Sequence, residues 1–376
     1  MSARRSRPER RDRAGPGTAD GEASPAFPTA PASPTAPASP TSPGEEDAYP
    51  LDRTNQRQLD PEFQGPVVVC DIDKTYLATN FETLRGLLSI PFEFAVDKRA
   101  ITGMAPLLRE VRRGPGSHSR LTPLYFVSAS PPQLRRILQK KMLLDGVEFD
   151  GITFKDQLRI LRHGRVRRLR EHLSFKLTAL LLYHADFPPG AREILIGDDT
   201  ESDALCYTIY GDAVAGRLRG ERLRATLVRH GVGVADAAAV AARVEGIAPR
   251  DSLARIYIHL EKRTPPESFA EYGRLAASRD ALQLALDLWS AGEIALPGVV
   301  RVAAALREAG RPLPDLVSSL LDARARGMVT GAAAAEAAAA LVARSLWPAG
   351  LTLGAVDDPA PRAPHEGMLT PERLLG

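Results

Sequence analysis

The sequence predicts an α/β fold in which helices cover both faces of a parallel β-sheet. Through the middle of the chain, short apolar runs alternate with segments of helical periodicity, a pattern typical of βαβ units. The first run, Val67–Ile72, is apolar except for Asp71, as expected for a strand that is buried on both faces and carries a polar residue near its end. Polar residues follow the apolar runs directly, at the strand ends where parallel sheets bind ligands.

The remaining elements follow the same alternation. We expect further strands at Leu124–Val127, Gly151–Phe154, Glu193–Ile196 and Ile256–Leu260. Helical periodicity predicts helices at Gly103–Val111, Ser130–Leu144, Leu173–His184 and Ser202–Tyr210. In the second helix, Ser130 is expected as the N-cap and Pro131 as the first helical residue.

The two ends of the chain differ from this middle part. Residues 1–60 are rich in Pro, Ala, Ser and Arg and lack apolar periodicity, so we expect a disordered tail. From about Pro265 onward the pattern predicts helices only, at Ala281–Ser290, Val299–Glu308, Leu313–Ala325 and Gly331–Leu341. We therefore divide the chain into an α/β domain (61–263, with an insertion at 213–250), a helical annex (264–347) and a loose tail (348–376).

Composition excludes several classes of protein. The 376 residues carry a formal net charge of only +3, so the overall charge identifies no partner. Cys70 and Cys206 are the two cysteines and are not closely spaced, which argues against a disulfide scaffold or zinc site and fits a reducing cytoplasm. No apolar run is long enough for a transmembrane helix. The basic N-terminus lacks the apolar region of a secretory signal, and we expect its Arg4–Arg13 cluster to be solvated rather than bound to an anionic partner.

The first predicted strand ends in two carboxylates that point toward chemistry. Asp71 and Asp73 project to the same side of an extended strand, and their repulsion is costly without a cation or a shared proton. A hard divalent cation takes such oxygen ligands. One carboxylate can attack phosphorus while the other acts as acid and base. The alternative is that either residue caps the next turn.

Residues that could act together with these carboxylates follow the predicted strand Leu124–Val127 and begin the predicted helix Leu173–His184. The Ser128 hydroxyl can bond a phosphoryl oxygen near a helix N-terminus, whereas for Ser130 capping is the better explanation. Lys176 lies near the start of an apolar helix, where a cation is unfavourable unless a negative group lies close to it. The alternative for Lys176 is a surface lysine whose stem covers apolar neighbours.

The fourth strand ends in an acidic loop. Four of the six residues from Asp198 to Asp203 are acidic, namely Asp198, Asp199, Glu201 and Asp203. Gly197 before them permits close backbone approach. The cluster predicts a cation site, the alternative being a solvated acidic loop.

These four segments, in this order, resemble the four motifs of the haloacid-dehalogenase superfamily over residues 66–212. Within it, the chain is most similar to the phosphatidate phosphatase catalytic domain of the yeast actin-patch type, which is related to lipins. Gly103–Ala105, Tyr125–Pro131 and Asp203–Tyr207 carry that likeness. Two departures are Lys74, where that group usually has an acidic residue, and the insertion Ala213–Arg250.

The resemblance implies a HAD-like Rossmannoid fold and a magnesium-dependent phosphatase. Asp71 would be the nucleophile and form an aspartyl phosphate, with Asp73 as acid and base. Mg²⁺ would be held by Asp71, the main-chain carbonyl of Asp73 and Asp198, with Asp199 or Asp203 supporting its waters. The groups expected at the substrate are Thr75, Ser128, Ala129 and Lys176.

The substrate stays open at this point. Tyr76–Thr102 and Gly151–Glu171 are too short for a large cap, and an open site suits a bulky or membrane-bound substrate. The arginines of Arg159–Arg170 could attract anionic lipid or nucleic acid, the alternative being a solvated basic helix face. No aromatic residues interleave with them to stack on bases. We favour a phosphatidate phosphatase that is cytoplasmic or peripheral to a membrane. The alternatives are a phosphatase for a nucleic-acid end, phosphoprotein or small metabolite, and a non-catalytic binding protein, against which the intact motif set argues. Nothing in the sequence indicates the oligomeric state.

Overall fold

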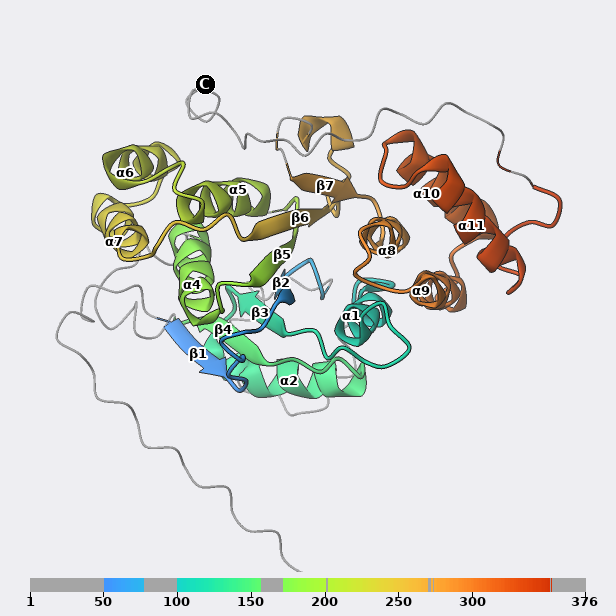
Figure 1. The fold of residues 1–376 in the computed structure, drawn as a ribbon, viewed down its shortest axis with the longest axis horizontal. Coiled ribbons are helices and arrows are strands. Elements are labelled where there is room, and N and C mark those ends of the chain that lie inside the picture. Colours follow the sequence, from blue (N-terminus) through green and yellow to red (C-terminus); the bar gives the residue numbers. More distant parts are fainter. Residues whose placement is uncertain are drawn as a thin grey trace, which may run out of the picture. The chain divides into compact units, whose positions relative to one another are not determined.

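A single seven-stranded sheet organises the protein (Figure 1). The computed structural model describes residues 51–77, 100–156, 172–200, 202–269, 272, 274–351 and 353. The strand order is β1-β4-β3-β2-β5-β6-β7, and every neighbouring pair is parallel except β1 and β4. The strands are β1 (Leu51–Asn55), β2 (Gly65–Asp71), β3 (Leu124–Ser128), β4 (Gly151–Lys155), β5 (Ala191–Asp198), β6 (Leu253–His259) and β7 (Leu275–Ser278). The predicted parallel α/β sheet is confirmed.

Helices cover both faces of this sheet, as predicted. One face carries α4 (His172–Asp186), α5 (Asp203–Val214), α6 (Gly220–Arg229) and α7 (Val234–Glu245). The other carries α1 (Met104–Arg113), α2 (Arg135–Leu144), α8 (Ala281–Ser290), α9 (Leu296–Glu308), α10 (Leu313–Ala325) and α11 (Gly331–Val342). Two short 3₁₀ helices, η4 (Pro132–Leu134) and η6 (Pro266–Phe269), complete the described elements.

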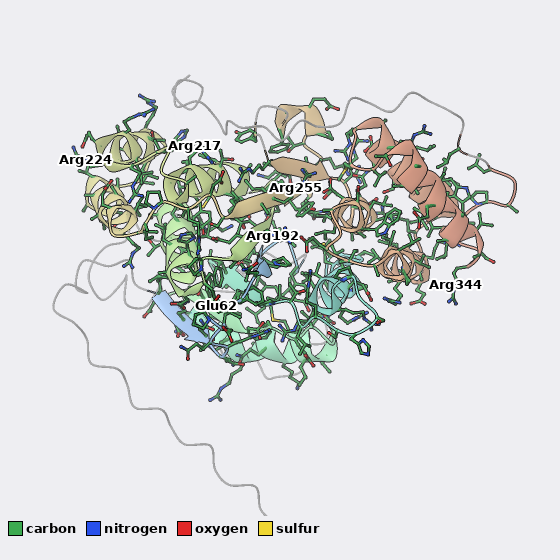
Figure 2. The ribbon with its side chains drawn as sticks, in the orientation of Figure 1. Glu62, Arg192, Arg217, Arg224, Arg255 and Arg344 are labelled. Atoms are coloured by element: carbon green, nitrogen blue, oxygen red, sulfur yellow. The ribbon has the colours of Figure 1, made fainter. Side chains whose placement is uncertain are left out.

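The central strand β2 is buried on both faces because its residues alternate between two apolar cores. Val67 and Val69 pack with α4 and α5, whereas Val68 and Cys70 pack with α1 and α8. This alternation is the period of two of an extended strand. Side chains from the strands and the covering helices fill the space between the layers (Figure 2). The apolar run is therefore explained by burial on both sides.

Two strands lie where the sequence predicts none. β1 falls inside the expected tail, and β7 falls in the range expected to be helices only. β1 has little apolar character and is stabilised by contacts from elsewhere, such as the Arg53 guanidinium 4.6 Å from the Tyr183 ring centroid. β7 consists of Leu-Ala-Ala-Ser, a weak strand sequence that the edge of β6 orders by pairing. The remaining tail predictions, for residues 1–50 and 354–376, and the Arg159–Arg170 cluster lie outside the described residues.

The predicted annex shares a core with the sheet. Buried residues of α8, α9, α10 and α11 form one apolar cluster with α1, β2 and β3. Arg301 of α9 donates two hydrogen bonds of 2.6 Å to the carboxylate of Glu110 on α1. Gly298 allows this approach, because a Cβ there would lie 3.0 Å from Glu110 Oε2. The boundary near residue 263 therefore crosses a continuous apolar core.

The insertion at 213–250 folds into α6 and α7, which pack together on the face that carries α4. Leu223 and Leu227 of α6 and Val240 of α7 join the core on that face.

Among the described helices, none combines the length and the apolar character needed to cross a membrane.

We predict that a chain ending at residue 263 loses cooperative thermal unfolding. It lacks β7 and α8–α11, which share an apolar core with α1, so each buried apolar side chain of α1 that loses this cover would cost about 1.5–3 kcal/mol. Calorimetry of this truncation measures the loss, with a chain ending at residue 353 as the control. A cooperative transition at the parent temperature would mean that residues 264–347 form an independent domain.

Candidate active site

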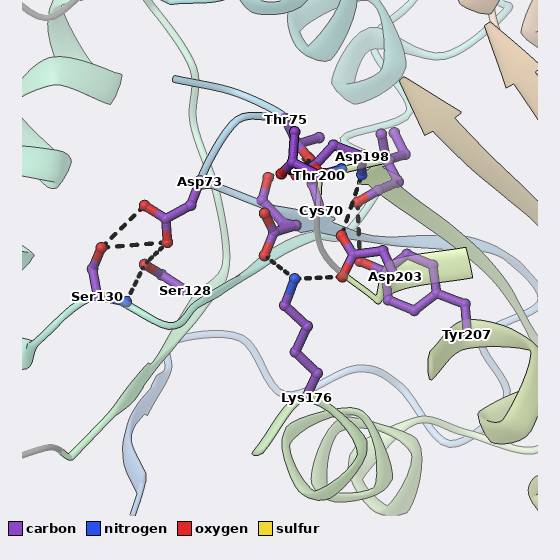
Figure 3. A network of polar contacts seen from close by, with 12 residues as sticks. Cys70, Asp73, Thr75, Ser128, Ser130, Lys176, Asp198, Thr200, Asp203 and Tyr207 are labelled. Atoms are coloured by element: carbon purple, nitrogen blue, oxygen red, sulfur yellow. Dashed lines mark hydrogen bonds and ion pairs between the residues drawn. The ribbon is translucent and has the colours of Figure 1, made fainter. Parts of the chain in front are cut away.

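Three strands bring polar side chains to one edge of the sheet (Figure 3). Asp71, Ser128 and Asp198 are the last residues of β2, β3 and β5. Because β2 lies between β3 and β5 and all three run parallel, their carboxyl ends lie side by side. The strand ends that the sequence predicts as the site are therefore adjacent in the structure.

Lys176 reaches this edge from α4 and joins two carboxylates. Its Nζ lies 3.0 Å from Asp71 Oδ1 and also bonds Asp203, at the start of α5. The Lys176 side chain is 1% exposed, as is that of Asp71, and that of Asp203 is fully buried. The alternative of a surface lysine is therefore wrong, and Lys176 has the negative neighbours that its place near a helix start requires.

Asp71, Asp198 and Asp203 form a buried acidic trio. Each offers a carboxylate oxygen, and these oxygens all lie within 4.8 Å of one another. Three carboxylates and one lysine ammonium leave a formal charge of −2, which is costly to bury. Hard oxygen donors with that charge fit a divalent cation such as Mg²⁺. A solvated acidic loop is therefore wrong for Asp198 and Asp203, both at 0% exposure.

Hydroxyl and amide groups orient the trio. Thr75 Oγ1 donates to Asp198 Oδ2 at 3.3 Å, and the amide and hydroxyl of Thr200 donate to the other oxygen. The Asp198 amide donates to Asp203 Oδ2 at 3.2 Å. Gly197 makes room for this contact, because a Cβ there would lie 2.3 Å from Asp203 Oδ2.

Two serines at the carboxyl end of β3 bind the Asp73 carboxylate. Ser128 Oγ donates to Asp73 Oδ2 and Ser130 Oγ to Asp73 Oδ1, both at 3.0 Å. The predicted N-cap role of Ser130 is wrong, because α2 begins only at Arg135, after η4. Ser130 is thus a site residue that the capping pattern concealed. Ala129 lies between the two serines.

Asp199 points away from the trio. Its Oδ1 accepts from the Lys262 amide at 2.8 Å and its Oδ2 from the Thr264 amide at 3.1 Å. The structure therefore brings Asp203, and not Asp199, to Asp71 and Asp198. Glu201 lies outside the described residues.

Two ionisable groups behind the site remain neutral. Burial, followed by the nearby Asp71 carboxylate, raises the pKa of the Cys70 thiol, which donates to the Asp71 carbonyl at 3.1 Å. Burial and then Asp203 likewise raise the pKa of Tyr207, whose hydroxyl donates to the Ile196 carbonyl at 3.3 Å. Neither group adds negative charge to the trio.

Comparison with known families bears on this site. Residues 66–225 match the model of the family described as phosphatidate phosphatase APP1, catalytic domain. The predicted resemblance is confirmed. The APP1-type segment runs from β2 into α6 and holds the acidic trio, Asp73, both serines and Lys176. No curated protein and no solved structure gives a significant match to the chain.

We predict that Gly197→Ala destabilises the protein by about 1–3 kcal/mol, because its Cβ would overlap the buried Asp203 carboxylate. Chemical denaturation measures the change. Gly246→Ala is the matched control, because Gly246 has a negative φ and its nearest neighbour would be 3.5 Å from the new Cβ. Equal stability of the two variants would contradict the close packing of the acidic loop.

Proposed function

We propose that this protein is a magnesium-dependent phosphatidate phosphatase that works through an aspartyl phosphate on Asp71. The observation that carries the proposal is the buried contact of Lys176 with Asp71 and Asp203, beside Asp198. Together with the match of residues 66–225 to the APP1 catalytic domain, it favours a phosphoryl-transfer site. Positioning and charge neutralisation dominate catalysis of such transfers.

The first half-reaction uses Asp71 and Asp73. An oxygen of Asp71 attacks phosphorus, so an O–P bond forms to Asp71 while the bond from phosphorus to the leaving oxygen breaks. Asp73 gives its proton to that oxygen, which leaves as the alcohol of diacylglycerol. Ser128 and Ser130 hold the Asp73 carboxylate through both of its oxygens, which limits its rotation.

In the second half-reaction water attacks the phosphorus of the aspartyl phosphate. Asp73, now ionised, accepts a proton from that water, and the bond from phosphorus to Asp71 breaks to release inorganic phosphate. Lys176 stays beside Asp71 and offers N–H donors to the phosphoryl oxygens in both steps. Asp71 and Asp73 thereby return to their starting states.

The residues present fit Mg²⁺. Asp71 and Asp198 would hold the ion, with the main-chain carbonyl of Asp73, and Asp203 would support it while bonded to Lys176. Bound there, Mg²⁺ would neutralise charge on the phosphoryl oxygens. Thr75 donates to Asp198, so we assign it the role of orienting that carboxylate, in addition to the role at the substrate that the resemblance implies.

Phosphatidate is the substrate that the family match favours. Because phosphatidate is a membrane lipid, we expect the reaction to take place at a membrane surface. We predict that the purified chain with Mg²⁺ releases phosphate from phosphatidate in mixed micelles faster than from an aryl phosphate. Asp71→Asn should lower both rates at least about 10³-fold, because an amide is a poor nucleophile, and a chelator should stop turnover.

Asp251→Asn provides the matched control. Asp251 forms ion pairs with Arg217 and Arg274 just before the first residue of β6, at the end of the sheet away from the acidic trio. Full activity of Asp71→Asn would remove the nucleophile assignment. A preference for the aryl phosphate would favour another phosphoester, and release from neither substrate would favour a binding role.

A further inference from the structure

The acidic loop is bound to the loop that follows β6. This second loop, residues 260–264, is named here the β6 loop. Asp199 extends the β5–β6 pairing, because its amide donates to the His259 carbonyl at 3.1 Å. The Asp199 carboxylate then accepts from the Lys262 amide at 2.8 Å and the Thr264 amide at 3.1 Å. Both carboxylate oxygens are thus directed at the β6 loop.

The β6 loop contains a residue in a left-handed conformation, and its amides bond both within the loop and to Asp199. Arg263 has φ 57°, a left-handed conformation uncommon for a residue other than glycine. The two amides that donate hydrogen bonds to Asp199 belong to Lys262 and Thr264, the residues immediately before and after Arg263. Such strain persists only where the surroundings hold it, and Asp199 is the described side chain that bonds both sides of the turn.

Lys262 completes the connection in the reverse direction. Its Nζ donates to the Thr200 carbonyl at 2.7 Å. Thr200 in turn donates its amide and hydroxyl to one oxygen of Asp198, while Thr75 donates to the other. A continuous chain of bonds therefore runs from the β6 loop through Thr200 to a carboxylate of the acidic trio.

We propose that Asp199 and Lys262 are positioning residues for the cation of the acidic trio, and that neither is a ligand of that cation. They hold the acidic loop so that Thr200 fixes the Asp198 carboxylate in the orientation the cation needs. Partners of this kind commonly change metal affinity 10- to 100-fold when removed. The inference rests on the proposed function only in that the trio binds Mg²⁺; it does not depend on the substrate.

Titration calorimetry of the full chain with MgCl₂ tests this inference without any assay of activity. Asp199→Ala should weaken Mg²⁺ binding about tenfold. Lys262→Ala should weaken it less, because the backbone amide of residue 262 still bonds Asp199. Asp199→Asn keeps one carbonyl acceptor for the two amides and should fall between the parent and Asp199→Ala.

Asp251→Ala is the matched control, since it removes a carboxylate that flanks the opposite end of β6 and should leave Mg²⁺ affinity unchanged. Unaltered affinity in both Asp199→Ala and Lys262→Ala would overturn the proposal. Loss in both Asp199 variants with none in Lys262→Ala would make Asp199 a ligand and overturn it as well. If Asp199→Ala fails to fold, Lys262→Ala decides.

The two proposals fail separately. Parent protein that binds Mg²⁺ with the expected variant order but releases no phosphate would refute the proposed function alone. Parent protein that hydrolyses phosphatidate while Asp199→Ala and Lys262→Ala bind Mg²⁺ as tightly as the parent would refute the positioning role alone.

Discussion

The buried contact of Lys176 with Asp71 and Asp203 is the interaction on which the rest of the site depends. A lysine and three carboxylates lie together with almost no exposure to water. Removing Lys176 would leave the buried carboxylates of Asp71 and Asp203 without their countercharge, at a cost of roughly 3–5 kcal/mol. The surrounding fold must therefore hold β2, α4 and α5 in fixed register, which the apolar core on that face does through Val69, Leu177 and Ile209.

The two faces of the sheet contribute differently to function. The face with α4 and α5 supplies Lys176 and Asp203. The opposite face, with α1 and α8–α11, contributes apolar packing against Val68, Cys70 and Phe126. The residues of the acidic trio lie on β2, β5 and α5 and not on these helices. The C-terminal helices thus act on the site indirectly, by burying the second side of β2 and β3.

Much of the site could be predicted because its residues follow apolar strands directly. Asp71, Ser128 and Asp198 each end a strand whose burial is visible as an apolar run. Ser130 could not be recognised, because Ser-Pro before a helix also fits a cap, and only the position of Asp73 decides between them. Asp203 joins the trio and Asp199 does not, because Asp199 bonds the β6 loop, some sixty residues away in sequence. No local sequence pattern can encode such a contact. β1 and β7 escaped prediction because pairing with β4 and β6, not their own composition, makes them strands.

The central claim is that Asp71 becomes phosphorylated. The most direct measurement is an acid quench of the parent chain during turnover of phosphatidate with Mg²⁺, followed by mass spectrometry of its peptides. The account predicts one added phosphoryl group on Asp71, labile to base, and none in the Asp71→Asn variant. Turnover in the steady state without any phosphorylated peptide, or with the phosphoryl group on another residue, would contradict it.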